Sequence, residues 1–84
     1  KTTPISTFPN PAKDKITFAL KNTDKHHNIK LECYDIFGRK VHEQKIYTGQ
    51  LEAEADISEW GKGMYVVVVK SNGKTLGRTK FIVE

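Results

Sequence analysis

The sequence has little cysteine, no long apolar run and no block of like charge. Cys33 is the one cysteine among the 84 residues, so no internal disulfide can form. The longest apolar run, residues 64–69, is far shorter than the roughly 20 residues that a membrane-spanning helix needs. These absences exclude a disulfide-stapled scaffold and a membrane-spanning helix within the 84 residues. There is also no signal peptide, and the first residue is Lys, so we expect a piece of a longer chain with any targeting element elsewhere.

The charged residues are interspersed rather than clustered. The formal net charge is +4, yet no five like charges follow one another. This pattern indicates a solvated surface, with an anion-binding patch as the alternative. Aromatic residues do not alternate with basic ones as a single-strand nucleic-acid binder requires, so we expect no nucleic-acid partner.

Patterns that would support catalysis or metal binding are weak. The serines lack a nucleophile-elbow context, and no pair of carboxylates is spaced as in a glycosidase. Cys33 falls on the apolar side of a predicted strand, where a buried, inert thiol is expected. His26 and His27, with Asp24 nearby, are interpreted as surface loop residues rather than a metal site. We therefore expect no catalytic residue, no metal and no cofactor.

A valine-rich segment, residues 64–69, is the strongest structural signal in the chain. Four consecutive valines follow Met64 and Tyr65, and valine favours the extended backbone of a strand. Continuous apolarity predicts a central strand with both faces covered. Gly61 and Gly63 allow the turn that leads into it.

The remaining apolar residues alternate and predict the other strands. These strands cover residues 16–20, 29–33, 41–47, 51–57 and 76–83, and residues 1–8 form either a linker or a short edge strand containing Pro4. Val41 and Ile46 differ in parity, which indicates a bulge or an edge strand. Asp35-Ile36-Phe37-Gly38 predicts a tight turn, and Asn72-Gly73 a two-residue hairpin. Six or seven short strands without a helix of useful length predict an all-β, mostly antiparallel β-sandwich.

Several short motifs occur in a characteristic order along the chain. They are Phe8-Pro9-Asn10-Pro11-Ala12, then Tyr34-Asp35-Ile36-Phe37-Gly38-Arg39-Lys40-Val41, then Asp56-Ile57-Ser58 leading to Gly63-Met64-Tyr65-Val66-Val67, and finally Thr79-Lys80-Phe81-Ile82-Val83. In this order they resemble the type A C-terminal sorting domains of the type IX secretion system (Por secretion system) of Bacteroidetes. The resemblance extends over nearly the whole chain.

The resemblance implies a fold and a function. The fold is an immunoglobulin-like sandwich of seven strands, and residues 1–84 form a single sorting domain. The domain has no chemistry of its own. It directs a covalently attached cargo protein through the outer-membrane translocon, after which a surface sortase commonly removes it. The implied location is the cell surface or the exterior, reached through the periplasm and the outer membrane.

Two sets of site residues follow from the residues and the resemblance together. The structural set comprises the corner residues Pro9, Asn10 and Pro11, the turn residue Gly38, and Gly63 with Tyr65 at the start of the central strand. The recognition set comprises Arg39, which can offer its donor fork to a partner, and Lys80, Phe81, Ile82, Val83 and Glu84. A terminal strand can present an unpaired backbone edge to a receptor by strand addition.

An accessory carbohydrate- or protein-binding module of a secreted enzyme is the alternative function. Such a module needs an exposed aromatic platform, for which Trp60, Tyr34, Tyr47 and Tyr65 are available. Trp60 lies between apolar segments and is predicted to fill the end of the core instead.

Overall fold

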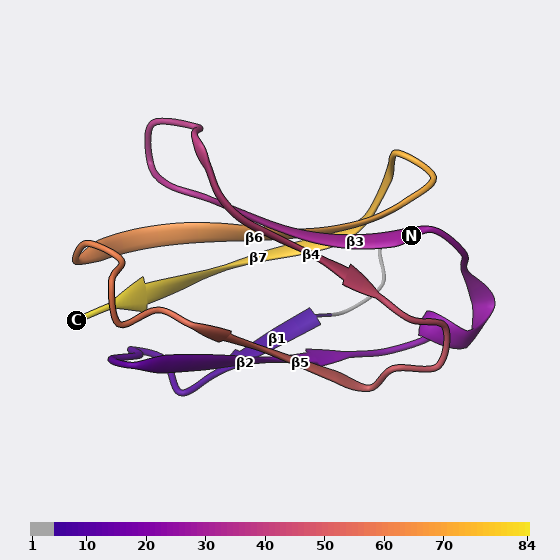
Figure 1. The fold of residues 1–84 in the computed structure, drawn as a ribbon, viewed down its shortest axis with the longest axis horizontal. Helices are drawn as coiled ribbons and strands as arrows, with labels where there is room; N and C mark the ends of the chain where they lie inside the picture. Colours follow the sequence, from indigo (N-terminus) through magenta and orange to yellow (C-terminus); the bar gives the residue numbers. More distant parts are fainter. Residues whose placement is uncertain (1–4) are drawn as a thin grey trace.

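The computed structural model describes residues 5–84, which form two antiparallel sheets packed face to face (Figure 1). The smaller sheet has the order β1-β2-β5, with β1 at Ile5–Phe8, β2 at Lys15–Leu20 and β5 at Glu52–Asp56. The larger sheet has the order β4-β3-β6-β7, with β3 at Ile29–Tyr34, β4 at Lys40–Ile46, β6 at Gly63–Ser71 and β7 at Lys74–Val83. A single 3-10 turn, η1 at Thr23–Lys25, interrupts the strands of the described chain.

This architecture confirms the predicted all-β, antiparallel sandwich, and its seven strands in two sheets are those of an immunoglobulin-like fold. The expected edge strand is present as β1, which pairs only with β2. The part of that prediction that concerns residues 1–4, including Pro4, lies outside the described residues. Within residues 5–84 no helix has the length and apolarity needed to cross a membrane.

The core lies between the sheets. It is built from the inward-facing residues, which alternate with outward-facing ones along the strands of both sheets. Phe18 from the smaller sheet and Phe81 from the larger one meet edge to face, with ring centroids 6.0 Å apart. Full burial of one such side chain contributes about 1.5–3 kcal/mol. Cys33 is fully buried on β3, and burial raises the pKa of its thiol to about 12. The thiol therefore stays protonated and inert, as predicted.

Strand β6 is internal to its sheet, as predicted, because it pairs with β3 on one side and β7 on the other. The prediction that both of its faces are covered is wrong for the start of the outer face, although Val68, farther along that face, is buried. Met64 is exposed and Val66 is half-buried there, whereas Val67 and Val69 point into the core. An antiparallel sheet can leave one face in water, and consecutive valines do not reveal which face that is.

Two further details separate the structure from the simple alternating pattern. The alternating pattern includes Leu51 in the predicted strand 51–57, but Leu51 precedes β5 and is 69% exposed. Its carbonyl instead accepts the Leu20 N–H at 2.8 Å. The sequence predicted a bulge or an edge location for the strand that contains Val41 and Ile46, and both are present. β4 is an edge strand, and its register with β3 shifts beside Tyr34.

Candidate functional site

The candidate functional residues gather at one end of the sandwich. In Figure 1 the turn between β3 and β4, the loop that enters β6 and the C-terminal residue all lie at the left-hand end. Arg39 belongs to the first of these segments and residues 80–84 to the last. Two recognition candidates that are some forty residues apart in the sequence are therefore brought to the same end.

Asp35 holds the β3–β4 turn in one conformation. Its Oδ1 accepts the backbone N–H groups of Phe37 at 2.9 Å and Arg39 at 3.0 Å, and its carbonyl accepts the Gly38 N–H at 3.0 Å. Gly38 has a φ of +83°, which a tight turn requires and a residue without Cβ adopts readily. Partial desolvation raises the pKa of Asp35, but the hydrogen bonds from Arg39 and Phe37 outweigh it and lower the pKa overall.

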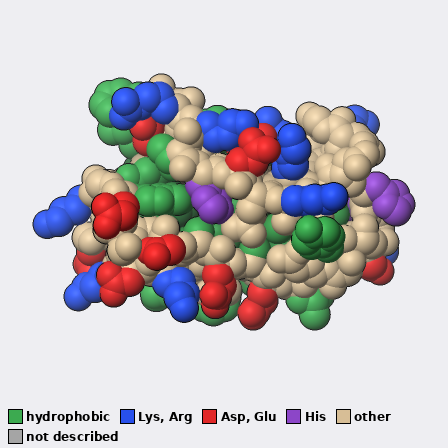
Figure 2. All heavy atoms as spheres, viewed as in Figure 1, with side chains coloured by type: hydrophobic (Ala, Val, Ile, Leu, Met, Phe, Trp, Pro, Cys, Tyr) green, Lys and Arg blue, Asp and Glu red, His purple; other side chains and the backbone are tan. Residues whose placement is uncertain are grey.

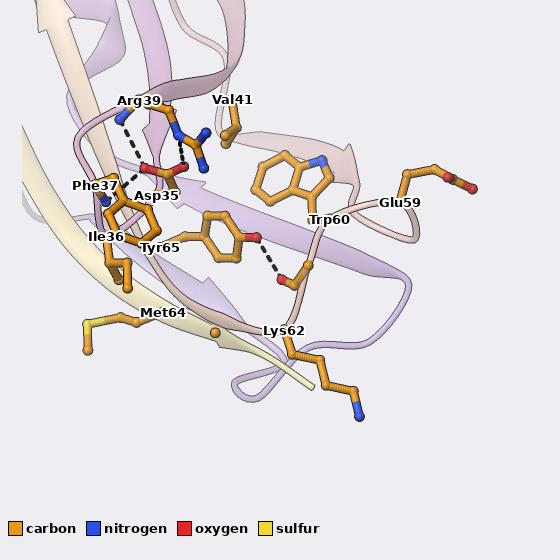
Figure 3. Close-up of a pocket in the computed structure, with 12 residues that line it drawn as sticks. Asp35, Ile36, Phe37, Arg39, Val41, Glu59, Trp60, Lys62, Met64 and Tyr65 are labelled. Carbon is orange, nitrogen blue, oxygen red and sulfur yellow. Dashed lines mark hydrogen bonds and ion pairs between the residues drawn. The ribbon is translucent and has the colours of Figure 1, made fainter.

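Arg39 is fixed by this turn but remains accessible. Its Nε donates to Asp35 Oδ2 at 2.8 Å, and its guanidinium carbon lies 5.4 Å from the centre of the Phe37 ring (Figure 3). The side chain is still 74% exposed. Because Asp35 engages only Nε, the two Nη groups are available to a partner carboxylate or phosphate.

The side chains at the end of β7 are divided between its two faces. Phe81 and Val83 are buried in the core, whereas Lys80, Ile82 and Glu84 are exposed. The outer face of β7 can therefore be displayed at this end of the molecule while its inner face holds the strand in place.

The expectation of an unpaired backbone edge is wrong for the last residues of β7. Asn10 Oδ1 accepts the Ile82 N–H at 3.0 Å, and the Ile82 carbonyl accepts the Ala12 N–H at 2.8 Å. Glu84 N–H donates to the Ala12 carbonyl at 2.8 Å. The backbone N–H and C=O groups of every second residue point away from β6, and those of Ile82 and the N–H of Glu84 are already paired with the corner. The free backbone edge of β7 can therefore begin only at Lys80 and continue toward the start of the strand.

The Pro9-Asn10-Pro11 segment forms the corner between β1 and β2, and the peptide bonds that precede the two prolines are cis. This corner carries Asn10 and Ala12 to the edge of β7, where Ala12 forms a parallel bridge with Val83. The sequence indicated only a rigid turn here. The contact with the far end of the chain could not be predicted from local residue preferences.

A groove separates the β3–β4 turn from the loop that enters β6, and we call it the terminal groove (Figure 3). Trp60 and Tyr65 lie in it with ring centroids 5.1 Å apart, and both pack near Phe81. The Tyr65 hydroxyl donates to the Gly61 carbonyl at 2.6 Å. Gly63, at φ +142°, begins β6 beside it. Trp60 fills the end of the core, as predicted.

The outer face of the larger sheet carries a charged cluster around Glu32. This mostly buried carboxylate accepts the Tyr34 hydroxyl at 2.6 Å and lies 3.0 Å from Lys70 Nζ and 3.5 Å from Lys40 Nζ. The hydrogen bonds from Tyr34 and Lys70 lower the pKa of Glu32 to about 2, against the effect of its burial. All its partners are side chains of the same sheet, so the cluster has a structural explanation.

Potential metal ligands are not grouped in the described part of the chain. Within residues 5–84 no three His, Cys, Asp or Glu side chains are grouped so that they could hold a metal ion. His42, which hydrogen-bonds Gln44 at 2.9 Å, has a pKa that burial lowers.

The aromatic platform that a carbohydrate-binding module needs is not assembled, because Tyr65 is buried and Trp60 and Tyr34 are half-buried. Of the four candidate aromatic residues, Tyr47 alone is largely exposed.

Sequence reasoning missed the apolar side chains that surround Arg39. Ile36 is 68% exposed and Phe37 is 75% exposed at the point of the turn, and Met64 is exposed on the opposite wall of the groove. A signal was present, because a four-residue turn usually carries polar residues and this one contains Ile and Phe. We call Ile36 and Phe37 the apolar tip.

Comparison with known proteins identifies relatives over nearly the whole chain. The family described as "Secretion system C-terminal sorting domain" matches residues 6–84. The ulvan lyase NLR42 of Nonlabens ulvanivorans is 28% identical over 79 residues, which cover 94% of this chain and 14% of that protein. The crystal structure of dimeric latent PorU from Porphyromonas gingivalis superimposes with a TM-score of 0.73 at 26% identity, covering 96% of this chain and 9% of PorU.

Proposed function

Because this chain belongs to the family of secretion system C-terminal sorting domains, the sorting signals of type IX secretion, we propose that it is read through Arg39 and the outer face of residues 80–84. Such a signal serves export to the cell surface or the exterior. The component that reads it is an outer-membrane protein of the type IX translocon, and a surface sortase then removes the domain. Sorting-signal domains are generally non-catalytic, and we assign no reaction to this one.

The observation that best supports this proposal is the division of the last strand into two faces. Phe81 and Val83 hold the strand in the core, so Lys80 and Ile82 are displayed in a fixed geometry. Ile82, which is 41% exposed, and the cation of Lys80 offer a receptor one apolar and one charged contact. The paired backbone of Ile82 and Glu84 means that side chains, rather than strand addition, are recognised at these positions.

We further propose that residues 1–84 constitute one domain attached to a larger cargo. The chain spans 14% of the ulvan lyase and 9% of PorU, so both relatives carry most of their length outside the matched part. The matched part is a small share of two otherwise different proteins, as expected for a signal domain that is attached to different cargoes.

A reporter fusion in a bacterium that has the type IX system tests the proposal. Removing residues 81–84 should abolish surface display, although the loss of Phe81 also reduces stability. The double variant Lys80→Ala/Ile82→Ser changes only the displayed face, so it should reduce surface display while the melting temperature stays near that of the unmodified domain. Surface and periplasmic reporter are measured side by side, with whole-domain deletion as the reference. Normal delivery by the truncated fusion would move recognition to the body of the sandwich, with Arg39 the next candidate.

A further inference from the structure

The apolar tip contains Phe37, which at 75% is the most exposed of the large apolar side chains in the described part of the chain. Figure 2 shows hydrophobic and basic side chains together at the upper left, where the β3–β4 turn stands above the sheet in Figure 1. Ile36 and Phe37 occupy the point of this turn, with Arg39 beside the Phe37 ring. Exposed apolar groups that are gathered in one place mark interaction sites more often than scattered ones do.

The tip is held rigidly, which distinguishes it from an ordinary surface loop. Asp35 accepts three hydrogen bonds through its carboxylate, from the backbone of Phe37 and from the backbone and Nε of Arg39. The Asp35 N–H also donates to the Arg39 carbonyl at 3.0 Å, which closes the turn at its base. A contact surface that is already ordered loses little conformational entropy on binding, so each apolar contact contributes more to affinity.

The tip is also continuous with the residues already proposed for recognition. Met64 lines the terminal groove with Ile36, and it is the cross-strand partner of Ile82 on β7. Ile36, Met64 and Ile82 therefore form an apolar path from the turn to the last strand. One partner could contact both regions without any change in the fold.

The charges around the tip indicate what the partner carries. Arg39 and Lys62 line the terminal groove as cations, while the Asp35 carboxylate is already occupied by its own turn. Glu59 is the other carboxylate lining the groove. The accessible guanidinium beside an apolar tip fits a protein pocket that is apolar inside and has a carboxylate at its rim.

We propose that the apolar tip is a second contact surface of the sorting signal, inserted into an apolar, acid-rimmed pocket of a translocon protein. This inference rests on the function proposed above and adds Ile36, Phe37 and Met64 to the residues that the translocon contacts. A protein partner fits better than a lipid surface because the tip stands beside a groove. A flat membrane would contact the tip and leave the groove walls at Val41 and Met64 unfilled.

The test uses the same surface-display fusion with the double variant Ile36→Ser/Phe37→Ser. Surface reporter should fall at least about tenfold, the loss expected when an interface hot spot is removed. The melting temperature should change little, because both side chains are exposed. The matched control is Tyr47→Ser/Leu51→Ser, which removes two side chains that are 65% and 69% exposed at the other end of the sandwich and should leave delivery unchanged.

Each outcome decides the inference. Equal amounts of surface reporter for the tip variant and the control variant would overturn the inference. If truncation of residues 81–84 still abolished surface display in the same experiment, the proposed function would remain supported. Unchanged display after deletion of the whole domain would overturn the proposed function itself.

A photo-crosslinking amino acid at position 37 distinguishes the partner classes. An adduct that mass spectrometry identifies as an outer-membrane protein of the translocon supports the inference. Adducts with lipid alone, together with binding to phosphatidylglycerol vesicles that the tip variant loses, would replace the protein pocket with a membrane surface.

Discussion

At the scale of single residues, two carboxylates organise the larger sheet and neither is free for chemistry. Asp35 is occupied by the backbone and guanidinium of its own turn, and Glu32 by Tyr34, Lys70 and Lys40. Both have a pKa below the usual value for their side chain. A general acid or base needs a pKa near the working pH, so these groups are built to stay ionised and to position their neighbours.

Gly38→Val should destabilise the domain more than Arg39→Ala does. Gly38 lies at φ +83°, and apart from Gly38 and its two chain neighbours no residue has an atom within 4 Å of the position that its Cβ would occupy. The penalty is therefore conformational, about 1–3 kcal/mol for a β-branched residue in the left-handed region. Arg39 is an exposed side chain whose removal costs within about 0.5 kcal/mol. Denaturant midpoints of the two variants decide the matter, and equal shifts would mean that the turn does not depend on Gly38.

Glu32→Gln should destabilise the domain at neutral pH by about 1 kcal/mol, since it removes a charged acceptor from Tyr34 and Lys70. The pKa of Glu32 is about 2 in the folded chain, below its ordinary value of 4.5. A carboxylate with a depressed pKa stabilises the fold above its unfolded pKa, and this contribution is lost as pH falls through the folded pKa. The difference between the variant and the unmodified chain should therefore shrink between about pH 4.5 and pH 2.

Denaturant unfolding of both chains at a series of pH values measures this difference. The control is Glu54→Gln on β5, whose carboxylate pairs with Lys15 Nζ at 3.9 Å between two well-exposed side chains. That variant should show little pH-dependent difference. A constant gap for Glu32→Gln down to pH 2 would contradict the assigned role of its charge.

At the scale of elements, the last strand is held on both of its edges. β6 pairs with one edge of β7, and the corner after β1 covers the end of the other edge through Asn10 and Ala12. The chain thereby connects its first described strand to its last. A paired edge also protects the end of β7 from unwanted strand pairing with other molecules.

Asn10→Ala should release the end of β7 locally. The substitution removes the acceptor of the Ile82 N–H and leaves the Ala12 bridge in place. The Ile82 amide should exchange its hydrogen faster, with a global cost of about 1 kcal/mol or less. Amide exchange followed by NMR checks this, with the Val67 amide at the centre of the sheet as the internal control. Unchanged protection at Ile82 would show that the Asn10 side chain does not hold this edge.

Most strands were predictable because alternation identifies the buried face of a strand directly. Residues 16–20 and 29–33 were found nearly to the residue, and so was the Asn72-Gly73 hairpin, where both residues have positive φ. The sequence could not show which neighbour covers a face or an edge. The exposed outer face at Met64 and the pairing of Asn10 with Ile82 depend on contacts between distant segments, which a period of two residues does not encode.

The candidate site was predictable in part for the same reason. Arg39 and the faces of residues 80–84 followed from the turn and the alternating pattern. Their arrangement at one end of the sandwich, joined through Met64, required the sheet order β3-β6-β7. Ile36 and Phe37 in a tight turn were a signal in the sequence, but residue type alone does not show whether such side chains pack inward or project into solvent, as they do here.

At the scale of the whole molecule, the stability of the fold comes from one core between two sheets. The buried residues of both sheets form a single cluster, in which Phe18 and Phe81 meet across the two sheets. Cys33, the chain's one cysteine, is buried within this cluster. A domain of this size buries little surface and has only marginal stability from burial, so its ability to fold without the rest of a longer chain is tested by experiment.

We predict that residues 1–84 fold alone and that neither chelator nor reductant changes the midpoint of thermal unfolding. The two antiparallel sheets complete each other's core, and the buried thiol of Cys33 has no partner with which to form an internal disulfide. A bound metal or a cross-link worth only 1 kcal/mol would show clearly, since that loss lowers the midpoint of a 60–100-residue domain by about 4–8 °C. Calorimetric scans with and without EDTA, and with and without dithiothreitol, make the comparison, and repeated scans test reversibility. A midpoint several degrees lower under either reagent would mean that the fold depends on a bound metal or on a cross-link between chains, and the packing between the sheets would then be insufficient to hold the domain.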